Sequence, residues 1–143
     1  MIRIAKMSDT IELARLSEQL DYPVTDEQME GRLQRLLSEP NNAIYVFEVS
    51  QNRLAGWAHV FGKHLIELEY AEIGGLIVDR DYRRQGIGEK LMKKCEDWAK
   101  ENGYQEVRLR SGGKRKEAHE FYVHIGYENI NLQQVFKKKI DLC

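Results

Sequence analysis

Arg83-Arg84-Gln85-Gly86-Ile87-Gly88 is the most informative part of this 143-residue chain. It follows an apolar run at residues 74–78 and opens a segment whose apolar residues recur at helical spacing. Two glycines one residue apart let the backbone turn and approach a ligand without Cβ clashes. The first N–H groups of a helix lack internal partners, and the helix dipole adds positive charge at that end. The sequence therefore predicts an anion site suited to phosphate, and with it a phosphorylated cofactor.

Two common phosphate-binding loops fit this segment poorly. A P-loop requires Gly-Lys-Ser or Gly-Lys-Thr at its end, whereas Gly88 is followed by Glu89-Lys90-Leu91. A dinucleotide-binding loop requires a third glycine, and Leu91 occupies that position.

The pattern Arg83-x-x-Gly86-x-Gly88 resembles the pyrophosphate loop of the Gcn5-related N-acetyltransferase (GNAT) superfamily, which binds acetyl-coenzyme A. Residues 71–79, AEIGGLIVD, resemble the fourth strand of that family, and residues 118–127, AHEFYVHIGY, resemble its later A-x-x-F-Y-x-x-x-G-[FY] motif. The three blocks have the family's order and spacing. The chain is thus identified as a member that looks like the bacterial small-molecule enzymes, a likeness that is a weak guide to substrate.

Composition limits the other possibilities. Apolar residues make up 42% of the chain, which suits one domain over residues 1–143 with an ordinary core. A net charge of −1 and a pI near 6.4 speak against a nucleic-acid-binding protein. No apolar run reaches the ~20 residues that a membrane span needs. Cys95 fits a helix core, Cys143 is terminal, and no Cys/His cluster has zinc spacing, so we expect a cytoplasmic protein without metal.

Hydrophobic periodicity predicts the order β-α-α-β-β-β-α-β-α-β-β. The expected strands lie at residues 2–4, 43–49, 54–61, 65–78 and 106–110, with a final hairpin over residues 127–140. The expected helices run from Ser8 or Asp9 to Leu20, from a capping box at Thr25 to Leu37, from the loop to about Glu101, and over residues 118–125. This is the order of the acetyltransferase family, and the resemblance implies the fold class α/β (α+β): a single mixed, mostly antiparallel sheet, splayed at its centre and flanked by about four helices.

The resemblance implies where acetyl-CoA would bind. Its pantetheine arm would lie where the strand ending at Val78 diverges from the strand at residues 106–110, and it would pair with backbone near Leu76 and Val78. Backbone N–H groups near Ile77 or Val78 would stabilise the oxyanion. The predicted cofactor-binding residues are Leu76, Ile77, Val78, Arg83, Arg84, Gln85, Gly86, Ile87, Gly88, Glu89, Ser111 and Arg115. The family often has Asn at the position of Arg115, so this residue either meets the cofactor or lies in a solvated loop.

Two residues are candidates for catalysis. Acetyl transfer to an amine with a pKa near ~10 requires removal of a proton, and Glu72 is the best candidate base. Glu72 could instead be a solvent-facing residue or an anchor for substrate charge; Glu67 and Glu69 are weaker candidates. Tyr122 matches the family tyrosine near the cofactor sulfur, where it would donate a proton to the leaving thiolate or only pack beside the pantetheine.

The first two helices and the start of the splayed strand would form the acceptor site, with Tyr22, Glu30, Glu69 and Tyr70 as substrate-binding residues. Acidic and aromatic groups suit a small cationic amine but do not separate an aminoglycoside from a polyamine, an amino acid or a protein lysine. We expect no nucleic-acid or membrane partner, and a possible homodimer through the C-terminal hairpin. Two other functions stay open: a non-catalytic acyl-CoA sensor or scaffold, and a protein that binds another nucleotide.

Overall fold

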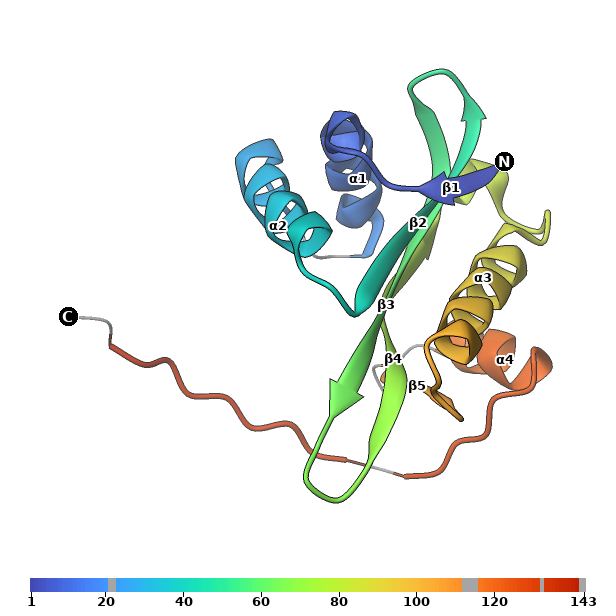
Figure 1. Ribbon diagram of the computed structural model, residues 1–143. Coiled ribbons are helices and arrows are strands. Elements are labelled where there is room, and N and C mark those ends of the chain that lie inside the picture. The colour runs from blue at the N-terminus through green and yellow to red at the C-terminus, as the bar shows by residue number, and fades with distance from the viewer. Residues whose placement is uncertain (21–22, 112–115, 132, 142–143) are drawn as a thin grey trace. The chain divides into compact units, whose positions relative to one another are not determined.

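One five-stranded sheet organises the first 110 residues in the order β1-β2-β3-β4-β5. The structure is a computed structural model that describes residues 1–20, 23–111, 116–131 and 133–141. The chain divides into two compact units, Met1–Arg110 and Ser111–Cys143, which we describe separately. Figure 1 shows the sheet running through the first unit between its helices.

The strands of the sheet are antiparallel except for the last pair. Strands β1 (Ile2–Ile4), β2 (Asn42–Ser50), β3 (Arg53–His64) and β4 (Glu69–Val78) pair antiparallel in succession. Strand β5 (Val107–Leu109) pairs parallel with β4 over Ala71 to Ile73. The mixed, mostly antiparallel sheet predicted from the sequence is confirmed.

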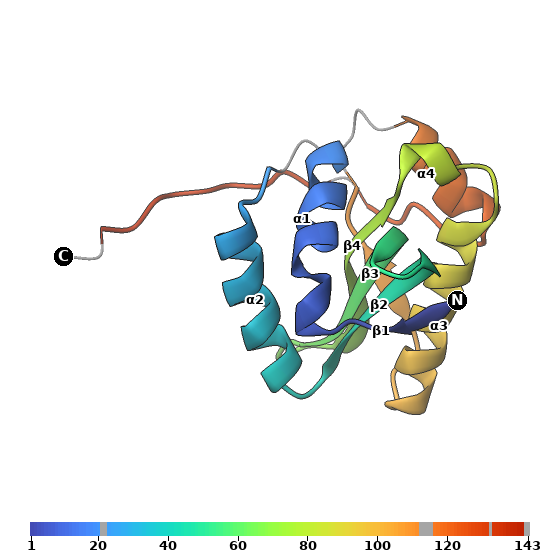
Figure 2. The same cartoon turned by 90° about the horizontal axis from the view of Figure 1, so that it is seen from above.

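Helices cover both faces of the sheet in the first unit. Helices α1 (Thr10–Ser17) and α2 (Asp26–Ser38) lie on one face, and α3 (Ile87–Glu101) lies on the other (Figure 2). Short 3-10 turns flank α1 as η1 (Met7–Asp9) and η2 (Glu18–Leu20), and a third, η3 (Arg80–Tyr82), follows β4. The predicted capping box is present, because the Gln28 N–H donates to Thr25 Oγ1 and the Thr25 N–H donates to Gln28 Oε1.

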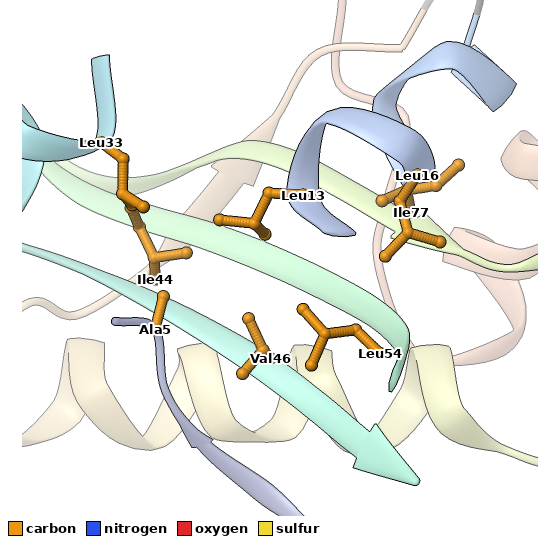
Figure 3. Packing of buried hydrophobic residues seen from close by; sticks show 8 residues of the cluster. All are labelled: Ala5, Leu13, Leu16, Leu33, Ile44, Val46, Leu54 and Ile77. Atoms are coloured by element: carbon orange, nitrogen blue, oxygen red, sulfur yellow. The ribbon is translucent and has the colours of Figure 1, made fainter. Parts of the chain in front are cut away.

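The core between the sheet and the first two helices is formed by alternate strand residues and the apolar helix faces. It contains Ala5, Leu13, Leu16, Leu33, Ile44, Val46, Leu54 and Ile77 (Figure 3). On the opposite face, α3 buries Leu91, Met92, Cys95 and Ala99. The core position predicted for Cys95 is confirmed, since its side chain is fully buried.

The second unit contains helix α4 (Lys116–His124) and a segment without regular structure. Gly126 ends the helix with φ of 106°. The predicted hairpin over residues 127–140 is wrong, because the described residues of this segment form no strand. The segment is rich in Asn and Gln, which are poor strand formers, and an isolated two-stranded hairpin is marginally stable in water.

The predicted start of the strand before the loop is also wrong. β3 continues to His64, which pairs with Glu69, so residues 65–68 form the connection between β3 and β4. The Leu65 N–H closes this turn by donating to the Leu68 carbonyl at 2.9 Å. Leu65 and Ile66 suggested a strand from their side chains, but both are exposed at the tip of a hairpin.

Candidate functional site

The Gly-rich loop (residues 83–88) leads from η3 into α3 through two left-handed residues. Arg84 has φ of 65° and Gly86 has φ of 76°. The left-handed conformation is uncommon for a non-glycine residue, and such strain tends to occur at functional sites. Gly86 is the N-cap residue of α3, and among the described residues no side chain caps the helix. The N–H groups of its first turn are therefore available to an anion.

The side chains around this helix end add positive charge. Arg83 and Arg84 are both exposed, as is Gln85, whereas Ile87 is buried against the core and anchors the start of α3. Glu89 is exposed in the first turn, so its side chain carries the opposite charge. Guanidinium groups and unpaired backbone N–H groups are the donors with which proteins commonly bind phosphate.

Strand β4 has one edge that is only partly paired. Strand β5 pairs with residues 71–73, and β4 then continues to Val78 without a partner on that side among the described residues. Leu76 and Val78 are half-buried, while the Ile77 side chain lies in the core. The backbone of residues 74–78 thus offers an open sheet edge that an extended ligand could pair with.

The glycine pair in β4 forms a bulge, one of the two features that glycines inside a strand indicate; the other is a close backbone approach. Gly75 pairs with His59 and Ile73 pairs with Val60, so Gly74 is an extra residue in a bulge. A Cβ on Gly74 would lie 2.7 Å from His59 Nδ1, and one on Gly75 would lie 2.7 Å from Trp57 Cη2. The two glycines make room for large rings on β3, in addition to any approach by a ligand.

Trp57 and His59 each have a buried ring nitrogen that makes no hydrogen bond to the described residues. These atoms are Trp57 Nε1 and His59 Nε2. Burial lowers the pKa of His59, so its ring is neutral at pH 7. His59 also borders a pocket of about 340 Å³ that includes Leu36, Pro40 and Phe61. Sequence analysis missed this face of β3, although the alternation Trp57-x-His59-x-Phe61 was visible.

Glu72 lies in β4 between two cations. Its Oε1 atom is 3.4 Å from Lys63 Nζ and 3.6 Å from Arg110 Nε, and its side chain is 13% exposed. Glu72 is the middle of the three β4 residues that pair with β5, two positions before the unpaired edge begins at Gly74. It has a structural use as well, because it neutralises a cation from β3 and another from the residue that follows β5.

The predicted acceptor residues differ in their surroundings. Glu30 is exposed on α2, and Glu69 is exposed with Oε2 2.9 Å from His64 Nδ1. Tyr70 is only 3% exposed, and the Arg108 guanidinium lies 4.5 Å from its ring centroid. Tyr70 therefore offers a ligand little surface in this structure. Tyr22 and Arg115 lie outside the described residues.

The second unit carries the other two predicted residues. Ser111 is half-buried at its start, and Tyr122 is half-buried on α4. The Tyr122 ring packs edge-on against Phe121 and Tyr127, with centroids 5.2 Å and 6.1 Å away. The Tyr127 N–H donates to the Tyr122 carbonyl at 2.9 Å, which holds the end of this helix.

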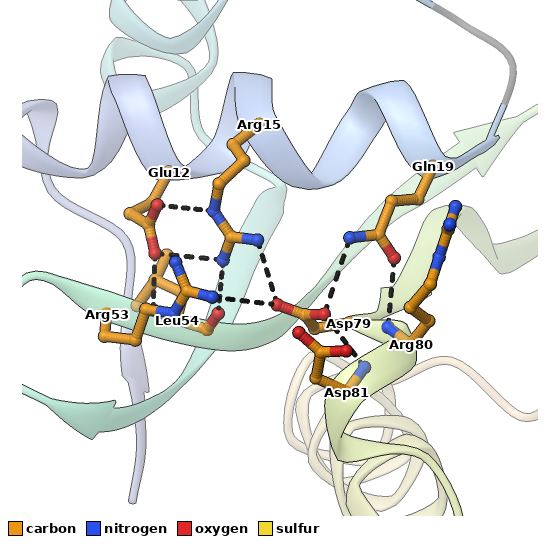
Figure 4. Close-up of polar contacts among 8 residues, drawn as sticks. All are labelled: Glu12, Arg15, Gln19, Arg53, Leu54, Asp79, Arg80 and Asp81. Atoms are coloured by element: carbon orange, nitrogen blue, oxygen red, sulfur yellow. Dashed lines mark hydrogen bonds and ion pairs between the residues drawn. The ribbon is translucent and has the colours of Figure 1, made fainter.

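A buried polar network next to the Gly-rich loop was not predicted from the sequence. Asp79, at the end of β4, is 1% exposed and contacts Arg15 from α1, Gln19 from η2 and Arg53 from β3 (Figure 4). The sequence signal was weak: an ion pair between Glu12 and Arg15, three residues apart on a helix, is usually a surface feature.

Two other kinds of site are absent from the described residues. Among them, no three His, Cys, Asp or Glu side chains are grouped so as to hold a metal ion. No helix in the described part of the chain has the length and apolar character of a membrane span.

Comparison with known proteins identifies the family. The model of the acetyltransferase (GNAT) family matches residues 8–127. The chain belongs to the GNAT acetyltransferase family. The match includes the Gly-rich loop, β4 and α4, and so extends across both units.

Individual relatives of this GNAT protein agree with the family assignment. An uncharacterized N-acetyltransferase of Methanocaldococcus jannaschii is 43% identical over 60 residues, which are 42% of this chain; the match spans about a quarter (26%) of that relative. An aminoglycoside N-acetyltransferase in complex with CoA has a TM-score of 0.86 at 14% identity, with 98% of this chain and 95% of that chain covered. Glucosamine-6-phosphate N-acetyltransferase from Arabidopsis thaliana has a TM-score of 0.81 at 24% identity, covering 97% and 98%. At these identities the two structures show a shared fold.

Proposed function

We propose that this protein is an N-acetyltransferase that moves an acetyl group from acetyl-CoA to the primary amine of a small cationic molecule. The observation that carries the proposal is the uncapped start of α3 behind the left-handed residues Arg84 and Gly86. Membership of the GNAT family makes acetyl-CoA the natural ligand of this site.

The residues of the first unit suit acetyl-CoA in charge and shape. Backbone N–H groups of Gly86, Ile87, Gly88 and Glu89, with the Arg83 and Arg84 guanidiniums, would bind the pyrophosphate. The edge of β4 at Leu76 to Val78 would pair with the amide groups of the pantetheine arm. When bound, acetyl-CoA supplies an acetyl group activated as a thioester.

Two side chains would move protons. Glu72 would accept a proton from the acceptor ammonium, since an amine with a pKa near ~10 is otherwise protonated at neutral pH. The amine nitrogen then forms the bond to the acetyl carbon as the bond from carbon to sulfur breaks. Tyr122 would donate its hydroxyl proton to the departing sulfur, and the tyrosinate would regain a proton from the acetylated nitrogen through solvent, which leaves a neutral amide and a free thiol. Ser111 and Arg115 stay predicted cofactor contacts.

The acceptor proposed is a small cationic amine. The two solved neighbours are named for acceptors that are an aminoglycoside and an amino sugar phosphate, which places amine-bearing sugars first in a screen. Exposed carboxylates at Glu30 and Glu69 favour a cation. A protein lysine as the acceptor, or an acyl-CoA sensor without turnover, are the alternatives that the experiments below separate.

The first experiment is ligand binding. Thermal unfolding with CoA, desulfo-CoA, ATP and NADH, each added separately, should show stabilisation by the two CoA compounds alone. A ligand at 100 times its dissociation constant stabilises by about 2.7 kcal/mol, which raises Tm by about 5–10 °C for a domain of this size. A larger shift with ATP or NADH would overturn the proposal. Binding of acetyl-CoA without thiol release in a screen of amines and lysine peptides would favour a sensor.

The second experiment tests the proton transfers once an acceptor is known. Glu72→Gln and Tyr122→Phe should each lower kcat by about 10²-fold or more while the Kd for CoA changes little, since general acids and bases contribute on this scale. Glu101→Gln is the matched control, because Glu101 is an exposed carboxylate at the end of α3 with no role in the proposed site. Unchanged kcat in both variants would show that the roles are assigned wrongly.

A further inference from the structure

Asp79 is a buried carboxylate at the junction between β4 and the Gly-rich loop. Its side chain is 1% exposed, although it lies only four residues before Arg83. Burying a charge is costly unless it is paired and hydrogen-bonded, so the contacts of Asp79 show what the chain gains from it.

The partners of Asp79 come from three separate elements. Arg15 Nη1 on α1 donates to Asp79 Oδ2 at 2.9 Å, and Arg53 Nη2 on β3 lies 3.7 Å from the same oxygen. Gln19 Nε2 approaches Asp79 Oδ1 at 3.5 Å. Arg15 is itself held by Glu12 at 2.6 Å and by the Leu54 carbonyl at 3.0 Å (Figure 4). The guanidinium is therefore fixed before it meets Asp79.

Four consecutive backbone N–H groups, at residues 79–82, also donate hydrogen bonds around this network. The Asp79 N–H donates to the Ala55 carbonyl at 2.7 Å, and the Arg80 N–H donates to Gln19 Oε1 at 3.0 Å. The Asp81 N–H donates to Asp79 Oδ1 at 3.0 Å, and the Tyr82 N–H donates to the Asp79 carbonyl at 2.8 Å. The backbone is thus held at every residue up to the point where the Gly-rich loop begins.

We propose that Asp79, held by Arg15 and Gln19, is a positioning residue for acetyl-CoA binding. It fixes η3 against α1, η2 and β3, so the loop leaves a rigid support with Arg84 and Gly86 already in their left-handed conformations. Preorganisation of this kind increases affinity, because the ordering cost is met before the ligand binds. The inference rests on the proposed function, since it concerns the same CoA site.

The sign of the effect separates positioning from simple electrostatics. Asp79→Asn removes a negative charge close to a site for anionic phosphate, and by Coulomb's law alone that change strengthens phosphate binding. Loss of the carboxylate as a positioning group weakens it instead. The two explanations therefore predict opposite changes in the Kd for CoA.

The chain provides a matched control for the loss of a buried ion pair. Asp9 is 6% exposed and accepts two hydrogen bonds from Arg3, at 2.8 Å and 2.9 Å, while Arg3 also pairs with Glu48. This network joins β1, η1 and β2 and includes no residue of η3 or the Gly-rich loop. Asp9→Asn makes the same chemical change away from the site.

The experiment measures CoA binding to the full chain by calorimetry, 15 °C or more below the Tm of each variant. We expect Asp79→Asn and Asp9→Asn both to lower Tm, but only Asp79→Asn to raise the Kd for CoA, by about tenfold, equivalent to about 1.4 kcal/mol. Gln19→Ala removes the acceptor of the Arg80 N–H but keeps the ion pair between Arg15 and Asp79, so this variant should fold. We expect it to raise the Kd for CoA by a few-fold. If Asp79→Asn does not fold, the Kd of Gln19→Ala tests the proposal instead.

Each contrary result has a distinct meaning. An unchanged or lower Kd in Asp79→Asn, or an unchanged Kd in Gln19→Ala, overturns the positioning role. An equal rise in Kd in Asp9→Asn shows a general loss of stability and overturns it too. Failure of the wild-type chain to bind CoA overturns the proposed function itself.

Discussion

Single residues show how this chain keeps charged groups inside its fold. Asp9 and Asp79 are both buried, and each is paired with an arginine that has a second carboxylate partner, Glu48 for Arg3 and Glu12 for Arg15. The paired arrangement compensates the desolvation of each charge. Removing one partner leaves the other buried and uncompensated, so these positions are sensitive to substitution and to pH.

Acid should destabilise the protein through these carboxylates. Burial opposes ionisation of Asp79, but hydrogen bonds from the Asp81 N–H and Arg15 outweigh it and lower the pKa; the pKa of Asp9 and of Glu12 is lowered in the same way by Arg3 and Arg15. A lowered pKa means that the stabilisation is complete above the unfolded value, near ~4, and is lost as pH falls below it. Urea titrations from pH 7 to pH 3 should show this loss, and a smaller one in Asp79→Asn. Parallel curves for the two proteins would contradict the prediction.

Cys95 should be chemically inert in the folded protein. Its side chain is fully buried, and burial raises its pKa to about 12, so little thiolate forms at pH 8. With Cys143→Ser as background, a disulfide reagent should label Cys95 only after unfolding by denaturant. Rapid labelling of the native protein would show that α3 opens locally.

Among the elements, β4 does the most to connect fold and function. One of its edges pairs with β3 along its whole length, and the other pairs with β5 only over residues 71–73. Its glycines accommodate Trp57 and His59, and Asp79 directly follows its last residue, Val78. The strand therefore combines an open edge, a bulge and an anchored exit into the Gly-rich loop.

Two glycine substitutions should have opposite effects on stability. In Gly75→Ala the new Cβ would meet the Trp57 ring at 2.7 Å, and such overpacking costs about 1–3 kcal/mol. In Gly31→Ala, on exposed α2, nothing lies within 4 Å of the new Cβ, and the higher helix propensity of alanine should stabilise by about 0.5–1 kcal/mol. Urea unfolding would measure both. Equal stability of Gly75→Ala and the wild type would mean that the Trp57 ring moves aside freely.

At the scale of the whole molecule, the C-terminal segment carries large apolar side chains that this single chain leaves exposed. Among its described residues, Ile130, Val135, Phe136 and Ile140 are 67%, 86%, 88% and 79% exposed. Exposed apolar groups close together commonly mark interaction sites. A homodimer, which the family resemblance leaves possible, stays a prediction that variants in this segment can test.

We expect the wild-type chain to sediment as a dimer at micromolar concentration, with Val135→Ser/Phe136→Ser shifting it toward monomer. Burial of these side chains against a second copy would supply part of the association energy. Val123→Ser, at an exposed position on α4, is the control. A monomeric wild type, or a double variant that dimerises as well as the wild type, would contradict this role for the segment.

Local patterns in the sequence determined the element order through α4, the Gly-rich loop and the family, because periodicity, caps and glycine spacing act between near neighbours in the chain. The tertiary structure alone decided how long-range partners meet. It placed Trp57 and His59 against the β4 glycines, Arg108 over Tyr70, and Arg15 on Asp79, 64 residues away. It also left the described residues between 127 and 140 without the predicted hairpin, because strand formation depends on a pairing partner, which no local pattern supplies.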